Sequence, residues 1–180
     1  MSQTSALLRE LEEIEEESSQ KISSAKTSVN ILPRTFKAID FEPGTVNLDY
    51  GGGRFDKVTE FLAAKDVVNY VYDPYNRSAE HNAEVLGAVR KNGGADTITC
   101  NNVLNVICEP SSRDRVIRNI KKLLKPGGTA YFLTYKGDGS GAGKETKAGY
   151  QNNRPTKFYV DEVEKHFSNV RIYKDVIIAQ

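Results

Sequence analysis

The residues with the clearest chemical potential lie in "NLDYGGGRFD", residues 47–56, where an apolar run carrying Asp49 leads into three consecutive glycines. Glycine lets a ligand approach the backbone closely, and the helix expected next would offer unpaired N–H groups to an anion. About 20 residues after Gly53, Asp73 ends a second apolar run, a separation typical of an acid that binds ribose hydroxyls. The pattern predicts a site for a nucleoside that carries an anionic group.

Two phosphate-binding motifs are incomplete at this turn. Gly51 and Gly53 supply the first two glycines of G-x-G-x-x-G, but Asp56 stands where close packing needs a third small residue. No Gly-Lys-Ser/Thr follows the turn, so the P-loop pattern fails as well. A phosphate is therefore the poorer candidate for the anion. A glycine turn that serves packing alone stays an alternative interpretation.

Short apolar runs alternate with amphipathic segments along the chain. Strands are predicted over residues 44–50 and 67–73, from residue 95, and over residues 129–135 and 169–179. Helices are predicted over residues 54–65, 78–92, 111–125 and 160–167, with a short helical turn around Phe36 and Ile39. This alternation predicts a Rossmann-like α/β fold, a mostly parallel sheet with helices on both faces. The glycine turn then lies at the carboxyl end of the first strand, where such sheets bind ligands.

Length and composition fit one soluble domain. The 180 residues carry a formal net charge of +1, which predicts no strong overall attraction to nucleic acid or membrane. Cys100 and Cys108 lack metal-ligand spacing, so both are interpreted as buried, reduced thiols, and no metal site is expected. No apolar run reaches the roughly 18 residues of a membrane span. We therefore expect a cytoplasmic protein without a membrane segment.

The first 28 residues are expected to form an acidic helical extension, and residues 29–180 the α/β domain. Leu7, Leu8, Leu11 and Ile14 recur at helical spacing among glutamates. This apolar stripe could contact a protein partner or a second copy of the chain. The alternative is a solvated, partly frayed helix.

Four landmarks in this order resemble those of class I S-adenosylmethionine (SAM)-dependent methyltransferases. They are the acid and glycine turn of residues 49–53, the acid of "YVYDPYN", the segment "ADTITCNNVLNVI", and the "LLKPGGTAYF" turn into a strand. The compact spacing and "NNVLNVI" are most similar to methyltransferases associated with DNA modification in bacteria and phages.

The resemblance implies SAM as the cofactor and gives roles to the residues of these landmarks. Asp49 would orient the amino group of the methionine moiety, and the backbone at Gly51 and Gly53 would admit its carboxylate. Asp73 would hold the ribose hydroxyls. The other positions expected around the cofactor are Tyr50, Pro74, Asn101, Asn102 and Val103. Arg34 could pair with the cofactor carboxylate or with a phosphate, because a guanidinium binds either group bidentately.

The sequence also departs from the family pattern. Only about 20 residues separate Asp73 from the strand that begins near residue 95, so the strand that normally contacts adenine is expected to be reduced or missing. One final strand is predicted where the family closes with a hairpin. No Asn/Asp-Pro-Pro-Tyr motif occurs where amino-methylating DNA enzymes carry it.

The acceptor side is predicted from polar residues at the strand ends and from the loop of residues 136–157. Asn102 and Tyr135 are the candidate catalytic groups that would face the acceptor, while His81 and His166 are expected on the surface. The loop residues expected to contact the phosphates and bases of a nucleic acid are Lys144, Lys147, Tyr150 and Arg154. A flexible loop whose charges are only solvated is the alternative.

Three functions remain open at this stage. The first is methyl transfer from SAM to a nucleic acid or a small molecule by in-line displacement, which needs alignment of the reactants and no metal. The second is a non-catalytic module that keeps the fold and binds a partner. The third, a nicotinamide-dependent oxidoreductase, is disfavoured by Asp56.

Overall fold

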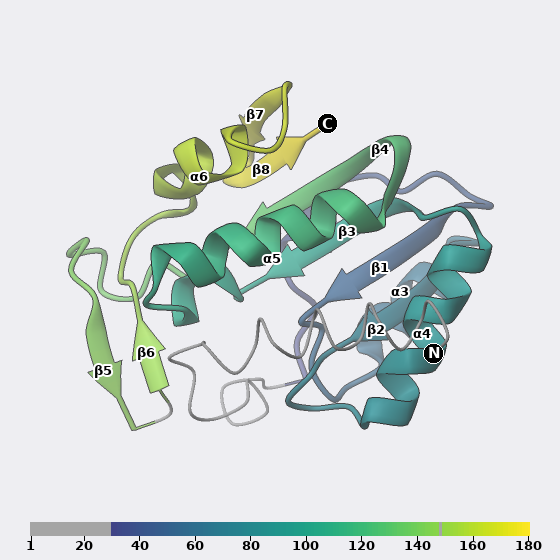
Figure 1. Ribbon diagram of the computed structural model, residues 1–180, viewed down its shortest axis with the longest axis horizontal. Helices are drawn as coiled ribbons and strands as arrows, with labels where there is room; N and C mark the ends of the chain where they lie inside the picture. The colour runs from purple at the N-terminus through teal and green to yellow at the C-terminus, as the bar shows by residue number, and fades with distance from the viewer. Residues whose placement is uncertain (1–29, 148) are drawn as a thin grey trace.

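The computed structural model describes residues 30–147 and 149–180. Its centre is a six-stranded sheet with the order β2-β1-β3-β4-β8-β7 (Figure 1). The parallel strands are β1 (Val46–Tyr50), β2 (Val68–Tyr72), β3 (Ala95–Asn101) and β4 (Leu124–Leu133). β8 (Val176–Ala179) runs antiparallel to β4, and β7 (Val170–Tyr173) pairs with β8 at the sheet edge. The predicted Rossmann-like, mostly parallel α/β fold is confirmed.

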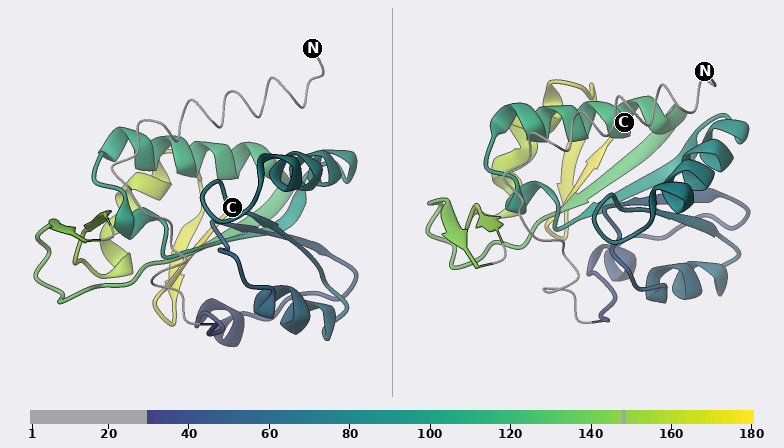
Figure 2. Two further views of the ribbon diagram at one scale, coloured as in Figure 1. Left: turned by 90° about the horizontal axis from the view of Figure 1, so that it is seen from below. Right: turned by 60° about the horizontal axis from the view of Figure 1, so that its bottom comes forward.

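Helices cover both faces of this sheet, as predicted (Figure 2). On one face lie α4 (Ala79–Lys91), α5 (Pro110–Leu123) and α6 (Val160–Glu164). Their apolar residues share one buried cluster with residues of the strands such as Ile98 and Phe132. The other face carries the short helices α2 (Thr35–Ala38) and α3 (Lys57–Ala63), which enclose a second, smaller cluster. The glycine turn and the strand ends lie between these two layers.

The start of the α4 helix holds the turn that contains Asp73. The Ser78 hydroxyl accepts the backbone N–H of His81 at 3.1 Å and caps the helix where the chain leaves the Asp73 turn. Asn82, one turn later, donates to the Asp73 carbonyl at 3.0 Å and accepts the Asp73 N–H at 3.1 Å. The start of α4 therefore fixes the backbone of the acid that ends β2.

Ser78→Ala is expected to lower the free energy of unfolding by about 1 kcal/mol, the usual cost of losing a side-chain cap. For a protein of this size that corresponds to roughly 2–4 °C in melting temperature. Thermal unfolding followed by circular dichroism measures the difference. Ser111→Ala is the matched control, because Ser111 is an exposed α5 residue that does not cap its helix. An equal loss in both variants would contradict the capping role.

The C-terminal segment, expected as a single strand, is instead a β-hairpin. Its turn consists of Lys174 and Asp175, which both have positive φ, 47° and 67°. The turn lets residues 176–179 pair with β4 while residues 170–173 form the sheet edge. The expectation that the closing hairpin is lacking was therefore wrong.

The strand expected to be reduced or missing is absent from the described residues. β2 is an edge strand whose single neighbour in the sheet is β1. After β2 the chain forms α4 and then enters β3, which pairs with the other side of β1. The described chain leaves β2 through the loop that follows Asp73, at the edge where a further strand would pair.

Four local predictions need correction. The Pro126–Gly128 turn lies inside β4 instead of before it, beside a register irregularity between Ala95 and Thr97. The α5 helix begins at Pro110, one residue before its predicted start, with Glu109 at its N-cap position and no side-chain cap. Cys108 is exposed, whereas Cys100 is buried as predicted. The loop of residues 136–157 contains a small hairpin of β5 (Lys144–Thr146) and β6 (Gly149–Gln151).

Two short 3-10 helices complete the described chain, η2 (Leu104–Val106) and η3 (Thr156–Tyr159). None of the helices within residues 30–147 and 149–180 combines the length and apolar character needed to cross a bilayer. The acidic helix expected over residues 1–28 lies outside the described residues.

Candidate cofactor and methyl-transfer site

The carboxyl ends of β1, β2 and β3 lie at the same edge of the sheet (Figure 1). Asp49 lies in β1 opposite Val71 of β2 and Thr99 of β3. The glycine turn follows β1, Asp73 follows β2, and Asn101 ends β3. These positions form one edge of the sheet, as the alternation of strands and helices predicted.

Asp49 is a buried acid without a cationic partner. It is 2% exposed, and the Thr99 hydroxyl donates to its Oδ1 at 2.8 Å. Burial raises the pKa of Asp49 to about 6, opposed by the Thr99 hydrogen bond and reinforced by the nearby charge of Asp73. No ion pair involves Asp49 in the part of the chain that the structure describes. A buried acid of this kind gains most from a ligand that brings a positive charge.

A chain of polar side chains inside the sheet orients Thr99. Asn47 donates to Thr99 Oγ1 at 3.2 Å and to Asn69 Oδ1 at 2.8 Å, and accepts from Thr97 at 2.8 Å. The occupied acceptor of Thr99 directs its own O–H toward Asp49. Sequence reasoning missed this network, although alternate polar residues in the apolar runs were visible as Asn47 and Asp49, and as Thr97 and Thr99.

The glycine turn has the backbone conformation that its composition predicts. Gly51 and Gly53 have φ values of 75° and 78°, the left-handed region that other residues rarely adopt. Gly51 packs directly against the Val103 side chain, and Gly52 lies against the Asp49 carboxylate. Close packing by the protein's own side chains therefore explains in part why glycine is needed in this turn. A turn that serves packing was one of the interpretations that the sequence left open.

Arg77 also holds the glycine turn. This residue was not identified from the sequence. Its Nε donates to the Gly53 carbonyl at 2.9 Å, and its Nη2 pairs with Asp56 at 2.7 Å. Asp56, which disfavoured a pyrophosphate, thus serves as the partner of Arg77. The only hint in the sequence was an arginine four residues after Asp73.

Asp73 uses both carboxylate oxygens to hold the protein itself. Oδ1 accepts the backbone N–H groups of Tyr75 and Asn76, each at 2.9 Å. Oδ2 accepts the Gly53 N–H at 2.8 Å and the Asn76 side chain at 3.1 Å. Asp73 is 2% exposed. Because a carboxylate has about four acceptor sites, ribose hydroxyls could bind Asp73 only by replacing some of these bonds, and the ribose role stays a prediction.

Asn101 contributes a buried amide close to Asp49. Thr35 of α2 donates to Asn101 Oδ1 at 2.5 Å, which directs the Nδ2 group the other way. Nδ2 is buried and forms no well-aligned hydrogen bond, but it lies close enough to Asp49 to lower the pKa of that carboxyl. Asn102 is exposed, has φ 60°, and donates its N–H to the Leu133 carbonyl at 2.8 Å. Thr35 is a site neighbour that the sequence did not reveal.

Three other predicted cofactor residues have different surroundings. The Tyr50 ring is buried and lies 4.9 Å from the Tyr72 ring, measured between centroids, so its side chain belongs to the core. Arg34 pairs with Asp175 of the β7–β8 turn at 2.9 Å, and a protein carboxylate thus holds its guanidinium. Pro74 is half-buried in the turn after Asp73.

The two histidines are half-buried and bonded, not simple surface residues. His81 Nε2 lies 2.8 Å from the Val71 carbonyl, and His166 Nε2 lies 2.7 Å from Asp114 Oδ1. Neither is bonded to a residue of the strand-end site. In the described residues no group of three or more His, Cys, Asp or Glu side chains could hold a metal ion.

On the acceptor side, Tyr135 follows β4 and is 62% exposed. Gln151 of β6 donates to the Tyr135 carbonyl at 2.9 Å and accepts from Asn105 at 3.1 Å, which ties the β5–β6 hairpin to the strand-end site. Lys144 and Lys147 are exposed at this hairpin.

The remaining two loop residues are partly enclosed. Arg154 lies 3.6 Å from Glu162 and stacks over the Tyr159 ring, so it is engaged within the protein. Tyr150 is half-buried, and its hydroxyl lies against Gly143. The loop therefore presents its lysines to solvent more fully than Arg154 or Tyr150.

Comparisons with known proteins bear on this geometry. The sequence matches a family described as "Methyltransferase domain" over residues 24–168. No curated protein matches the sequence. Similar solved structures include the methyltransferase CalO1 of calicheamicin biosynthesis in its SAH-bound form, at 15% identity and a TM-score of 0.52, covering 80% of this chain and 50% of that one.

Two further structures extend the comparison. Mitomycin 7-O-methyltransferase MmcR is 18% identical with a TM-score of 0.52, covering 81% of this chain and 51% of that one. Human N-acetylserotonin methyltransferase in complex with SAM is 16% identical with a TM-score of 0.55, covering 81% of this chain and 50% of that one. This chain thus spans about half the length of each of them, and none of their names refers to DNA.

The family match includes the glycine turn, both strand-end acids and β4, and the solved structures share the fold of the sheet and its helices. On this evidence the chain belongs to the methyltransferase-domain family.

Proposed function

We propose that this protein transfers a methyl group from SAM to an acceptor bound at the carboxyl edge of its sheet. The observation that carries the proposal is Asp49, a buried carboxylate without a cationic partner, next to a glycine turn with positive φ. An amino-acid ammonium group is the cation expected there. SAM supplies one, together with an electrophilic methyl group on its sulfonium.

The residues of the site would bind and align the cofactor. Asp49, oriented by Thr99, would accept the ammonium group, and the Asn101 Nδ2 beside it would donate to an acceptor atom of the ligand. Gly53 and Asp73 would hold the nucleoside once the bond between them opens. In-line displacement depends mainly on alignment and exclusion of water, and Asn102 and Tyr135 are the proposed groups that face the acceptor.

The acceptor class has support of two kinds. The names of mitomycin 7-O-methyltransferase and N-acetylserotonin methyltransferase refer to small molecules, which favours a small acceptor. The exposed lysines of the β5–β6 hairpin, Lys144 and Lys147, favour a polyanion such as a nucleic acid. We propose a small molecule first, with nucleic acid as the second candidate; the narrower likeness to DNA-modification enzymes belongs to the second.

Isothermal titration with SAM and with S-adenosylhomocysteine tests the cofactor directly. Binding followed by transfer of a labelled methyl group to phenols, amines or oligonucleotides would support the enzyme and identify its acceptor. Binding without transfer to any of these would favour a non-catalytic module. Absence of heat at millimolar ligand, with the fold intact, would reject SAM.

The affinity for SAM is expected to fall as the pH is lowered below about 6. The Asp49 carboxyl has its pKa raised to about 6, and the ammonium group binds the ionised form. Between pH 6 and pH 5 the dissociation constant should therefore rise toward tenfold per pH unit. Titrations at several pH values measure the slope. In Asp49→Asn the slope should disappear; an unchanged slope would assign the titration to another group.

A partner for the acidic segment of residues 1–28 also remains a proposal. Its glutamates and apolar stripe suit a protein partner or a second copy of the chain. Sedimentation of the full chain against a chain that begins at residue 29 would distinguish self-association from a monomer.

A further inference from the structure

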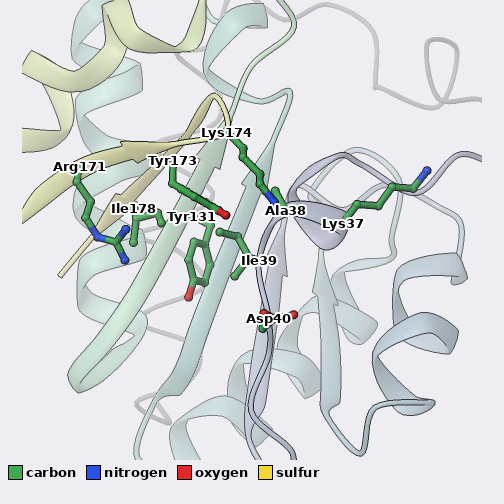
Figure 3. A pocket seen from close by; sticks show the side chains of 9 residues that line it. All are labelled: Lys37, Ala38, Ile39, Asp40, Tyr131, Arg171, Tyr173, Lys174 and Ile178. Carbon is green, nitrogen blue, oxygen red and sulfur yellow. The ribbon is translucent and has the colours of Figure 1, made fainter.

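A pocket of about 450 Å³ lies outside the candidate cofactor site (Figure 3). One wall is residues 37–40, the end of α2 and the two residues after it, and the other is formed by Arg171, Tyr173 and Lys174 of the β7–β8 hairpin. Tyr131 of β4 and Ile178 of β8 form the floor. Figure 3 shows Lys174 reaching across toward Ala38 and Ile39. The volume falls in the range of small-molecule sites.

The pocket has an excess of positive charge that the protein does not neutralise. Asp175, the acid of the hairpin turn, is paired with Arg34 at 2.9 Å. Within residues 30–147 and 149–180, neither Arg171 nor Lys174 forms an ion pair with a carboxylate. Lys37 adds charge at the rim, although Figure 3 shows its side chain directed away from Tyr131. The whole chain is nearly neutral, so this excess is local.

Two tyrosines of the lining, Tyr131 in the floor and Tyr173 in the wall, bring hydroxyl groups near these cations. Tyr131 is 9% exposed, and burial raises its pKa while the charge of Arg171 acts in the opposite direction, which shows that the guanidinium and this ring are close. The ammonium of Lys174 lies 5.0 Å from the centroid of the Tyr173 ring. Asp40, the single acid of the lining, lies apart from Arg171 and Tyr173 in Figure 3.

We propose that this pocket binds a small, hydroxylated phosphate ester, the class that includes sugar phosphates. A phosphate monoester carries about −1.5 to −2 charges at pH 7, which matches the two cations of Arg171 and Lys174. Guanidinium groups bind phosphate bidentately. Asp40 would repel the phosphate and accept a hydroxyl group from the other end of the ligand, so it sets the orientation. This proposal does not depend on SAM binding.

Titration calorimetry with ribose 5-phosphate at low salt tests the site in the full-length protein. The double variant Arg171→Ala/Lys174→Ala is expected to bind at least tenfold more weakly than the unchanged protein. The matched control is Arg118→Ala/Lys165→Ala, which removes the same charge from exposed positions on α5 and after α6, on the opposite face of the sheet. The control should bind within twofold of the unchanged protein.

Inorganic phosphate and ribose are the comparison ligands. Asp40→Asn is expected to strengthen the binding of inorganic phosphate and to weaken that of ribose 5-phosphate. Binding of ribose 5-phosphate in Asp49→Asn should be unchanged, which separates this pocket from the cofactor site. Equal binding by the double variant and the unchanged protein would overturn the proposal. So would an absence of binding to the folded protein, or inorganic phosphate binding as tightly as the ester.

Discussion

Asp49→Asn is expected to abolish most of the affinity for SAM while it makes the ligand-free protein more stable. The variant keeps an oxygen that can accept from Thr99 but loses the charge that would pair with the ammonium group. Removing one partner of a buried charge pair commonly costs about 3–5 kcal/mol. We therefore expect SAM to bind at least 100-fold more weakly, measured by titration calorimetry.

The stabilising half of this prediction follows from the pKa of Asp49. Its folded value of about 6 lies above the ordinary value of 3.8, so the ionised carboxylate opposes folding. This penalty is absent below pH 4, grows as the pH rises from 4 to 6, and is complete above pH 6. At 1.36 kcal/mol per pKa unit it amounts to about 3 kcal/mol at pH 7. Asp49→Asn should recover up to that amount, or several degrees in melting temperature.

The pH dependence provides the internal control. At pH 4 the two proteins should unfold at nearly the same temperature, because the folded Asp49 is neutral and the unfolded carboxyl is close to its ordinary pKa of 3.8, so most of the penalty is gone. Thr97→Val is a suitable comparison variant, since it removes one bond of the same network without touching Asp49. If Asp49→Asn instead destabilised the protein equally at pH 4 and pH 7, the buried carboxylate would not carry the penalty inferred from its burial.

The sheet and the strand-end acids were predictable because their causes are local in the sequence. Alternating apolar runs and amphipathic segments define the βαβ order, and right-handed crossovers place Asp49 and Asp73 at the same edge. The loss of the adenine-side strand followed from chain length alone, since the residues between Asp73 and β3 accommodate α4 and no further strand. These features needed no knowledge of side-chain contacts.

The C-terminal hairpin was not predictable in the same way. Two-residue turns with positive φ usually contain Asn-Gly or Asp-Gly, but here the turn is formed by Lys174 and Asp175. The apolar pattern continues on both sides of the turn and reads as one strand. The pairing with β4 supplies the energy that holds these residues in the left-handed region, and such a tertiary contact leaves no local mark.

The partners of the site residues depend on register, which the sequence does not specify. Thr99 reaches Asp49 because the two residues are paired across β1 and β3, and Arg77 reaches Gly53 because the turn after β2 folds back over the glycines. One partner could have been found. The sequence "DPYN" is a typical Asx turn, in which the aspartate accepts N–H groups two and three residues later, as Asp73 does.

Asp73→Ala is expected to damage both the fold and the cofactor site. The change leaves the N–H groups of Gly53, Tyr75 and Asn76 without their acceptor. A buried donor left unpaired, as at Gly53, costs about 1–3 kcal/mol before relaxation, and the part-buried N–H groups of Tyr75 and Asn76 cost less because water can reach them. We expect the free energy of unfolding to fall by about 2–4 kcal/mol, measured by urea denaturation. SAM affinity should fall at least 100-fold, because the glycine turn loses its anchor.

Loss of affinity in Asp73→Ala alone would not show that Asp73 binds ribose, since a purely scaffolding acid would give the same result. Asp73→Asn keeps one carbonyl oxygen for the turn and allows a cleaner comparison, with S-adenosylhomocysteine and its 2′-deoxy analogue as ligands. If Asp73 accepts the ribose hydroxyl, the unchanged protein should bind the deoxy analogue about tenfold more weakly than S-adenosylhomocysteine. In Asp73→Asn the difference in affinity between these two ligands should be much smaller. Equal losses in both proteins would restrict Asp73 to holding Gly53 and the turn at residues 75–76. The choice matters for the mechanism, because a ribose-binding Asp73 must first release the Gly53 N–H, and cofactor binding would then open the glycine turn that the free protein keeps closed.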